Sequence, residues 1–420
     1  MGIYIEESTM QNDQATDKHL PDGSGTDNAL AIESDEFQAA FGEPVDNTLD
    51  IDTWHLGDDL AAMYTRLERE IADAVEQGGR IRERIRSKLF PRAFKHPHAP
   101  ESAGCYKVDV ATIEQIHRGL LFNGGVEACD GTSMVHDTLP ITLAQIGVSL
   151  VSYQGDQGTW LHRLYRRDLR VGGIDPIGEA MALLEQRGKR DSTDAPSTRD
   201  RLSDFTQRGI MAYAERAILL HKSQAVWRMG HGHPVPYELL TGGGLVINRD
   251  MPLLSYSMKM WRELLIENKR WVFVSSAPSD RVLLTLGDAL DPLEFALVRT
   301  PLQSMRDIAG SHMSLQAGLK AKVQAFVEEL GPQIVVGLYR ASAQAPVRLF
   351  YAHRDCAHVA ALIAMADSVL QEHRGFPMLI DLADMICRST FGTGTFQSMI
   401  QQAYTEAGVP FRYLGERETR

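Results

Sequence analysis

The sequence lacks any apolar segment long enough to cross a membrane, and it contains few cysteines. No apolar run approaches the roughly eighteen residues that a membrane helix needs. The start of the chain has neither the basic nor the apolar region of a secretory signal. The four cysteines are widely spaced along 420 residues, unlike those of a disulfide scaffold. We therefore expect a protein of the cytoplasm, without membrane association, whose thiols are free.

Two other signatures are missing as well. No Gly-x-x-x-x-Gly-Lys-Ser/Thr loop is present, so any ATP hydrolysis must come from a partner. The segment Thr241-Gly242-Gly243-Gly244 lacks the lysine of a phosphate-binding loop and predicts a tight turn. His231 and His233 have a spacing known from metal sites, but no cysteine-rich segment matches them, and we expect no structural zinc.

Negative charge is concentrated at the start of the chain. The net charge is −12, but residues 1–50 contain twelve carboxylates and one lysine, so that this segment alone carries −11. The remainder is close to neutral, which leaves room for a local basic groove and does not exclude DNA binding. Residues 1–50 are predicted to be an acidic disordered tail. Alternatively, this tail competes with DNA for a basic groove or docks a partner.

The next region has the periodicity of helices. Between residues 54 and 89 apolar side chains recur at helical spacing, which predicts one long or two shorter amphipathic helices, with a break at Gly78-Gly79. We therefore divide the chain into the tail, a helical extension at 51–100 and a folded domain at 101–420. The helical extension is a candidate surface for dimerisation or docking.

The folded domain begins with patterns typical of strands. Segments at 127–130, 141–153 and 160–171 predict three antiparallel strands, and a helix follows at 202–221. Residues 237–240 predict a further strand, which would end in the glycine turn. Strands and helices then alternate: strands at 271–275, 294–298, 334–339 and 347–351, and helices at 252–268, 314–330, 358–371, 377–388 and 395–407. This order predicts an α/β fold with an RNase H-like mixed sheet flanked by helices.

Carboxylates occupy three positions that suit metal-dependent chemistry on such a scaffold. Two-metal phosphodiester hydrolysis needs three or four carboxylates around two ions about 4 Å apart, and Mg²⁺ or Mn²⁺ prefers oxygen ligands. An RNase H-like fold supplies them from strand one, the first helix, strand four and a C-terminal helix. Asp130, followed by a predicted turn at Gly131, suits the first place, Glu215 the second and a C-terminal Asp, at 381 or 384, the last.

Two motifs resemble the NurA family of nucleases: Glu127-Ala128-Cys129-Asp130-Gly131-Thr132, and the segment 374–384, which reads Arg-Gly-Phe-Pro-Met-Leu-Ile-Asp-Leu-Ala-Asp. The resemblance covers about residues 105–410. It implies a DNA nuclease in which Asp130, Glu215 and Asp384 hold Mn²⁺ or Mg²⁺. It also implies a homodimer that acts with a HerA-like hexameric ATPase, in DNA end processing or antiphage defence.

The sequence departs from the family pattern at the third motif. The family has a second Asp-Gly pair at the end of a strand, and here Thr241 stands where the Asp is expected. Glu238 could supply the carboxylate, but alternation along a strand would place Glu238 and Thr241 on opposite faces unless a bulge intervenes. Glu238 is therefore a doubtful fourth ligand.

Basic residues on the third predicted strand are candidates for contacts with the DNA backbone. Arg163, Arg166 and Arg167 could lie along phosphates without reading sequence, although a solvated sheet face explains them equally well. Arg281 follows a predicted buried strand and could also meet phosphate. The alternative for the segment around Arg281 is an ordinary helix N-cap.

A second function of a different class fits the same residues. Asp-Gly is a common turn dipeptide, Glu215 could be an ordinary helical glutamate, and Asp381 or Asp384 could be a cap or surface charge. With Thr241 in place of Asp, the chain could be a catalytically silent RNase H-like scaffold that regulates the translocase. Loss of DNA degradation on Asp130→Ala would distinguish the nuclease from this scaffold.

Overall fold

The computed structural model describes residues 36–54, 60–137, 141–166, 177–178, 181, 204–247, 250–275, 280–311 and 317–410. Most of the predicted acidic tail, residues 1–35, lies outside these ranges. The chain divides into two compact units, residues 1–78 and 79–420. Within the described ranges, no helix is both long enough and apolar enough to span a bilayer.

The described part of the first unit is helical. A short helix, α2 (Val45–Leu49), lies within the segment predicted to be a disordered tail, and the long helix α3 (Leu60–Arg84) begins in the region where amphipathic helices are expected. The predicted break at Gly78-Gly79 is wrong, because α3 continues through both glycines. Glycine costs about 1 kcal/mol in a helix interior relative to alanine, and the strong helix formers on both sides offset that cost. Apolar side chains of α3, such as Leu67 and Ile71, are more than half exposed.

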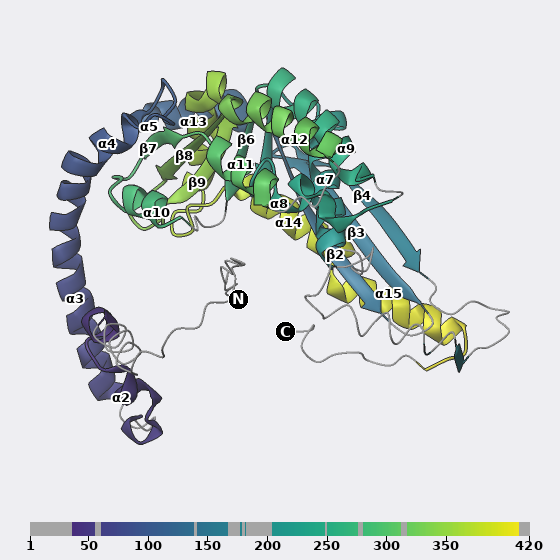
Figure 1. The fold of residues 1–420 in the computed structure, drawn as a ribbon, viewed down its shortest axis with the longest axis horizontal. Coiled ribbons are helices and arrows are strands. Elements are labelled where there is room, and N and C mark those ends of the chain that lie inside the picture. Colours follow the sequence, from purple (N-terminus) through teal and green to yellow (C-terminus); the bar gives the residue numbers. More distant parts are fainter. Residues whose placement is uncertain are drawn as a thin grey trace, which may run out of the picture. The chain divides into compact units, whose positions relative to one another are not determined.

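A mixed sheet forms the centre of the second unit (Figure 1). The described residues contribute nine strands, in the order β1-β7-β8-β9-β6-β5-β2-β3-β4. Their bounds are β1 (Gly104–Lys107), β2 (Val126–Asp137), β3 (Thr142–Ser152), β4 (Gly155–Arg166), β5 (Trp227–His231), β6 (Trp271–Ser275), β7 (Glu294–Arg299), β8 (Ile334–Arg340) and β9 (Arg348–His353). Strands β2, β5 and β6 are parallel neighbours, and the other pairs are antiparallel.

The predicted fold class is confirmed by the order of five of these strands. The meander β2-β3-β4 is antiparallel, as expected, and helix α7 (Asp204–His221) follows it. Strand β5 then pairs with β2 on the side away from β3, and β6 lies beside β5. The resulting order β4-β3-β2-β5-β6 is RNase H-like, and β9, β8, β7 and β1 extend the sheet beyond β6.

Helices cover both faces of this sheet. Successive side chains of a strand point to opposite faces, and here they are buried in two different apolar clusters. On β2, Cys129 belongs to the cluster that contains α7, and its neighbour Ala128 belongs to the cluster on the other face. The first cluster includes residues of α9 (Pro252–Trp261), α10 (Arg281–Asp288) and α12 (Ala317–Leu330). The second includes residues of α5 (Val110–Ile116), α13 (Ala357–Val369) and α14 (Met378–Phe391). Helices α11 (Leu302–Ser311) and α15 (Thr393–Glu406) complete the C-terminal half.

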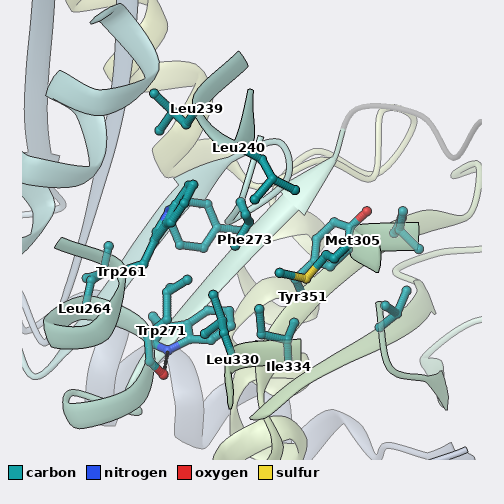
Figure 2. Close-up of a cluster of buried hydrophobic side chains, with 14 of the residues drawn as sticks. Leu239, Leu240, Trp261, Leu264, Trp271, Phe273, Met305, Leu330, Ile334 and Tyr351 are labelled. Carbon is teal, nitrogen blue, oxygen red and sulfur yellow. Dashed lines mark hydrogen bonds between the residues drawn. The ribbon is translucent and has the colours of Figure 1, made fainter. Parts of the chain in front are cut away.

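Large aromatic side chains fill the first cluster (Figure 2). Trp261 of α9 and Trp271 of β6 are fully buried, and their indole N–H groups donate to backbone carbonyls. Trp271 also packs against the ring of Phe273 in the same strand. Burial of each such ring stabilises the fold by about 2 kcal/mol or more. This cluster therefore fixes β6, and through it the neighbouring β5, beneath α7 and α9.

Two expectations about local structure are wrong, and both concern the candidate site. Asp130-Gly131 does not end a strand, because β2 continues to Asp137 and pairs with β3 throughout. Residues 237–240 form a short helix, α8 (Tyr237–Leu240), and the fourth strand of the RNase H-like order is β5. In both cases pairing between distant segments overrides a local turn or strand signal.

A buried carboxyl group anchors the start of α14. Asp367 of α13 accepts a hydrogen bond from the backbone N–H of Leu379 (2.9 Å) and another from the hydroxyl of Tyr153. Burial raises the pKa of Asp367 from 3.8 to about 7, and nearby Asp381 adds to this effect, while the two hydrogen bonds oppose it. The folded protein therefore favours the protonated carboxyl group.

We expect Asp367→Asn to flatten the dependence of stability on pH. Between pH 4 and 7 the native state holds a proton that the unfolded chain has lost, so the wild-type free energy of unfolding falls as pH rises. The total change is on the order of 4 kcal/mol, and asparagine, which does not titrate, lacks it. Urea unfolding at pH 5 and pH 8 captures about 3 kcal/mol of this change, and parallel profiles for the two proteins would contradict it.

Candidate functional site

A cleft opens where strands β2 and β5 separate. Their parallel pairing runs from Val126–Trp227 to Cys129–Gly230, and the next residue of each strand, Asp130 or His231, lines the cleft. The cleft has a volume of about 490 Å³. Its charged lining residues are Asp130, Arg208, Glu215, Arg216, His231, Glu238, Arg348, Arg374, Asp381, Asp384 and Arg388. The carboxyl ends of parallel strands are where open α/β sheets bind their ligands.

Three carboxylates reach this cleft from three different elements. Asp130 lies on β2 and is 7% exposed, and Glu215 lies on α7 and is 9% exposed. Gly131 makes room for Glu215, because a Cβ atom at position 131 would lie 2.7 Å from Oε1 of Glu215. Asp384 projects from α14, which packs on β2 from the other face. The structure thus places the three predicted ligands, Asp130, Glu215 and Asp384, in one cleft.

The electrostatics of the cleft show that these carboxylates influence one another. The pKa of Glu215 is raised to about 7, chiefly by burial and in part by the charge of Asp130, whereas Arg216 opposes the shift. Burial and Asp130 also raise the pKa of Asp384, against the opposing effect of Arg388. Like charges therefore meet in this cleft, and a bound cation would relieve their repulsion.

Each of these carboxylates also faces a cationic side chain of the protein. Glu215 Oε2 lies 3.0 Å from Nη1 of Arg216, and Asp384 Oδ1 lies 2.7 Å from Nε of Arg388. Asp130 Oδ2 lies 3.6 Å from Nδ1 of His231. The interaction with Asp130 raises the pKa of His231, although burial opposes it.

Arg216 is also the structural link between α7 and the segment after β5. It is 2% exposed, and its guanidinium group donates to the carbonyl oxygens of Ala212, His233 and Pro234. Its Cζ lies 5.2 Å from the centroid of the Phe273 ring. Arg216 therefore holds the turn that follows His231 in position beside Glu215.

The place of the third carboxylate in the RNase H-like order belongs to His231. The sequence prediction assigned this place to Thr241, but Thr241 follows a helix, and strand four ends at His231. The objection to Glu238 that rested on strand alternation therefore falls. Glu238 lies on α8, lines the cleft, and has Oε1 4.0 Å from Nε of Arg208.

The predicted DNA-binding arginines lie elsewhere or beyond the described residues. Arg163 donates to Oε1 of Gln145 (2.8 Å) and to the sulfur of Met399, and it does not line the cleft. Arg281 is the exposed first residue of α10, directly after the N-cap Asp280, so the N-cap alternative holds for this segment. Arg167 and the side chain of Arg166 lie outside the described part.

Sequence reasoning gave no role to several residues that line the cleft. Arg216 follows the predicted Glu215 in the sequence, and Arg374 is the first residue of the C-terminal motif, so both belong to segments that contain predicted site residues. Arg348 and Arg388 reach the cleft only through tertiary packing, from β9 and from the last turn of α14. No local pattern of charge or spacing distinguishes them from surface arginines.

The donor chemistry of the cleft fits a hard divalent cation. Oxygen ligands are those that Mn²⁺ and Mg²⁺ take in proteins, and the mutual repulsion described above involves all three carboxylates. Within the described ranges, however, no three histidine, cysteine, aspartate or glutamate side chains already have the arrangement of a metal site. Asp130, Glu215 and Asp384 are the residues that would hold such an ion.

Comparisons with known proteins reveal similarity only at the level of solved structures. No family model matches the chain, and no curated protein matches it. The NurA nuclease from Sulfolobus solfataricus is 10% identical, with 83% of this chain and 99% of that chain covered and a TM-score of 0.37. A NurA structure with manganese is 9% identical, with 76% and 94% covered and a TM-score of 0.39.

A second group of nucleases is found over a smaller part of the chain. Endonuclease V of Ciona intestinalis, in complex with an inosine-containing 23mer DNA, is 10% identical, with a TM-score of 0.24. That comparison covers 66% of this chain and 93% of the endonuclease chain. The structures found thus include the family that the two sequence motifs resemble.

Proposed function

We propose that the protein is a metal-dependent DNA nuclease. The observation that carries this proposal is the convergence of Asp130, Glu215 and Asp384 on one cleft, at the point where β2 and β5 separate in an RNase H-ordered sheet. Divalent ions bound by these carboxylates would supply Lewis acidity and lower the pKa of a water molecule. Mn²⁺ or Mg²⁺ suits the oxygen donors.

The protein's own groups support three parts of this role. Asp130 and Glu215 are held rigidly, one by β2 and one by α7, so their positions need little reorganisation. Arg216 and His231 lie beside them and balance negative charge when no ion is bound. The wall of the cleft is shaped by Gly131, whose missing side chain leaves the Glu215 carboxylate room beside β2.

A specific observation favours the second candidate, a catalytically silent scaffold. Glu215 and Asp384 each already face an arginine, and Asp130 faces His231, which stands where the fold would place a third carboxylate. If these pairs are permanent, the side chains stabilise the fold instead of binding metal. Binding of Mn²⁺ distinguishes the two functions.

We expect Mn²⁺ to raise the thermal unfolding midpoint of the wild-type protein, and to do so far less in Glu215→Gln. An ion that binds only the native state stabilises it by about 2.7 kcal/mol at one hundred times its dissociation constant. Glutamine can still accept the hydrogen bond from Arg216, so the variant should fold. Glu114→Gln, on the exposed surface of α5, is the matched control and should respond like the wild type. An equal response of Glu215→Gln, or none in the wild type, would favour the scaffold.

The partners remain part of the proposal. The motif resemblance supports a homodimer that works with a HerA-like hexameric ATPase, in DNA end processing or antiphage defence, in the cytoplasm. The exposed apolar side chains of α3 would suit either contact. Co-purification of the two proteins, followed by degradation of linear DNA with Mn²⁺ and ATP, tests this assembly.

A further inference from the structure

Two arginines from different elements come together on the wall of the cleft. Arg348 is the first residue of β9, and Arg374 lies in the turn before α14. The guanidinium group of Arg348 donates to the backbone carbonyl of Arg374. Both guanidinium groups also pack on the ring of Phe376, with Cζ 5.5 Å and 5.8 Å from the ring centroid. Contacts of this kind orient cationic groups at little cost in entropy.

The charges at this pair include two guanidinium groups and the carboxylate of Asp381. Arg374 contacts the carboxylate of Asp381, which also accepts a hydrogen bond from Nε2 of Gln371 (2.6 Å). Burial lowers the pKa of Arg348, and the charge of Arg374 lowers it further, against the effect of Asp381. An anion bound by both arginines would relieve their repulsion.

The other arginines of the cleft differ in this respect. Arg216 is matched with Glu215, Arg388 with Asp384, and Arg208 with Glu238. Each of these pairs brings one positive and one negative charge to the lining. At Arg348 and Arg374, by contrast, two guanidinium groups lie together and the charge of Arg374 lowers the pKa of Arg348. An added negative group is therefore favoured beside this pair.

We propose that Arg348 and Arg374 bind a backbone phosphate of the DNA strand and so position the strand relative to the carboxylates. This inference rests on the proposed nuclease function. Planar guanidinium groups match the geometry of phosphate oxygens and bind them with two parallel hydrogen bonds. Phe376 is 4% exposed, so it orients the arginines and offers no face on which a base could stack. The two arginines are positioning residues.

Binding of a fluorescein-labelled oligonucleotide in EDTA tests this site without cleavage. We expect Arg348→Ala and Arg374→Ala each to weaken binding about tenfold, and each to reduce the slope of log affinity against log salt concentration by about one. Arg374→Lys, which retains the charge, should recover part of the affinity. The side chain of Arg374 is 60% exposed, so its variants should fold even if Arg348→Ala does not.

Control variants and a competitor identify the anion. Arg281→Ala and Arg163→Ala should bind the oligonucleotide like the wild type, because neither residue lines the cleft. Inorganic phosphate should compete with the oligonucleotide on the wild type and less so on Arg374→Ala. If Arg374→Ala binds the oligonucleotide normally but no longer binds inorganic phosphate, the site serves a free anion and the proposal is overturned. Normal binding of both by Arg374→Ala also overturns it.

The proposed nuclease function can fail separately. Cleavage is measured with Asp130→Asn in Mn²⁺, whereas phosphate binding is measured without metal. Weakened binding by the arginine variants supports the phosphate site even if the Asp130 variant cleaves normally. In that case the strand is held in the cleft, and the carboxylates have another role.

Discussion

Asp130→Asn should reduce the degradation of linear DNA in Mn²⁺ by about 1000-fold or more. Asparagine keeps the shape of the side chain, and its carbonyl oxygen can still accept the hydrogen bond that Asp130 takes from the N–H of Gly131 (3.0 Å). The substitution removes the negative charge that raises the pKa of both Glu215 and Asp384. Carboxylates that act as a unit lose most of their effect when one is removed, and a 1000-fold loss corresponds to about 4 kcal/mol.

A matched control shows whether the loss of cleavage depends on removing a carboxylate from the cleft or on removing any carboxylate of the protein. Asp307→Asn changes an exposed carboxylate of α11 and should cleave like the wild type. EDTA, which removes the metal, should abolish cleavage by the wild type and by Asp307→Asn. Added Mn²⁺ should restore cleavage by these two proteins but not by Asp130→Asn. If Asp130→Asn degrades DNA at the wild-type rate, the nuclease assignment is wrong and the silent scaffold is favoured.

The first and last carboxylates could be predicted because local patterns locate their elements. Asp130 stands in an apolar strand before a long meander, and Asp384 stands one helical turn after Asp381 in a helix that begins after Pro377. Glu215 could be predicted because a helix must follow the third strand of an RNase H-like order. These elements are set by periodicity, which the sequence displays directly, whereas the choice of Asp384 over Asp381 rests on the resemblance of the C-terminal motif.

The rest of the site depends on contacts between distant segments. Strand β5 is only five residues long and includes Arg228, Gly230 and His231, so its sequence gives a weak strand signal. It is held as a strand by pairing with β2 and β6. Residues 237–240 have the more apolar sequence but follow Pro236 into a helical turn. The local pattern therefore places the end of the fourth strand at Thr241, whereas that strand ends ten residues earlier, at His231.

Arg216→Ala should be the most destabilising single change near the cleft, with a loss of about 3–5 kcal/mol in the free energy of unfolding. The substitution removes the donor to Pro234 (3.1 Å) and to His233 (2.6 Å), and leaves the Glu215 carboxylate buried without its cation. Unsatisfied buried carbonyls cost about 1–3 kcal/mol each. Urea unfolding measures the loss, and Arg208→Ala, an exposed arginine of the same helix, should change stability by less than about 0.5 kcal/mol.

A double-mutant cycle identifies which part of this loss comes from the buried charge. In Glu215→Gln the neighbouring side chain is neutral, so Arg216→Ala no longer leaves an unpaired carboxylate in the interior. The cost of Arg216→Ala should therefore be about 1–3 kcal/mol smaller in the Glu215→Gln background than in the wild type. Equal costs in both backgrounds would mean that Arg216 acts only through the carbonyls after β5. A smaller cost in the Glu215→Gln background would mean that the buried Glu215 carboxylate depends on the charge of Arg216.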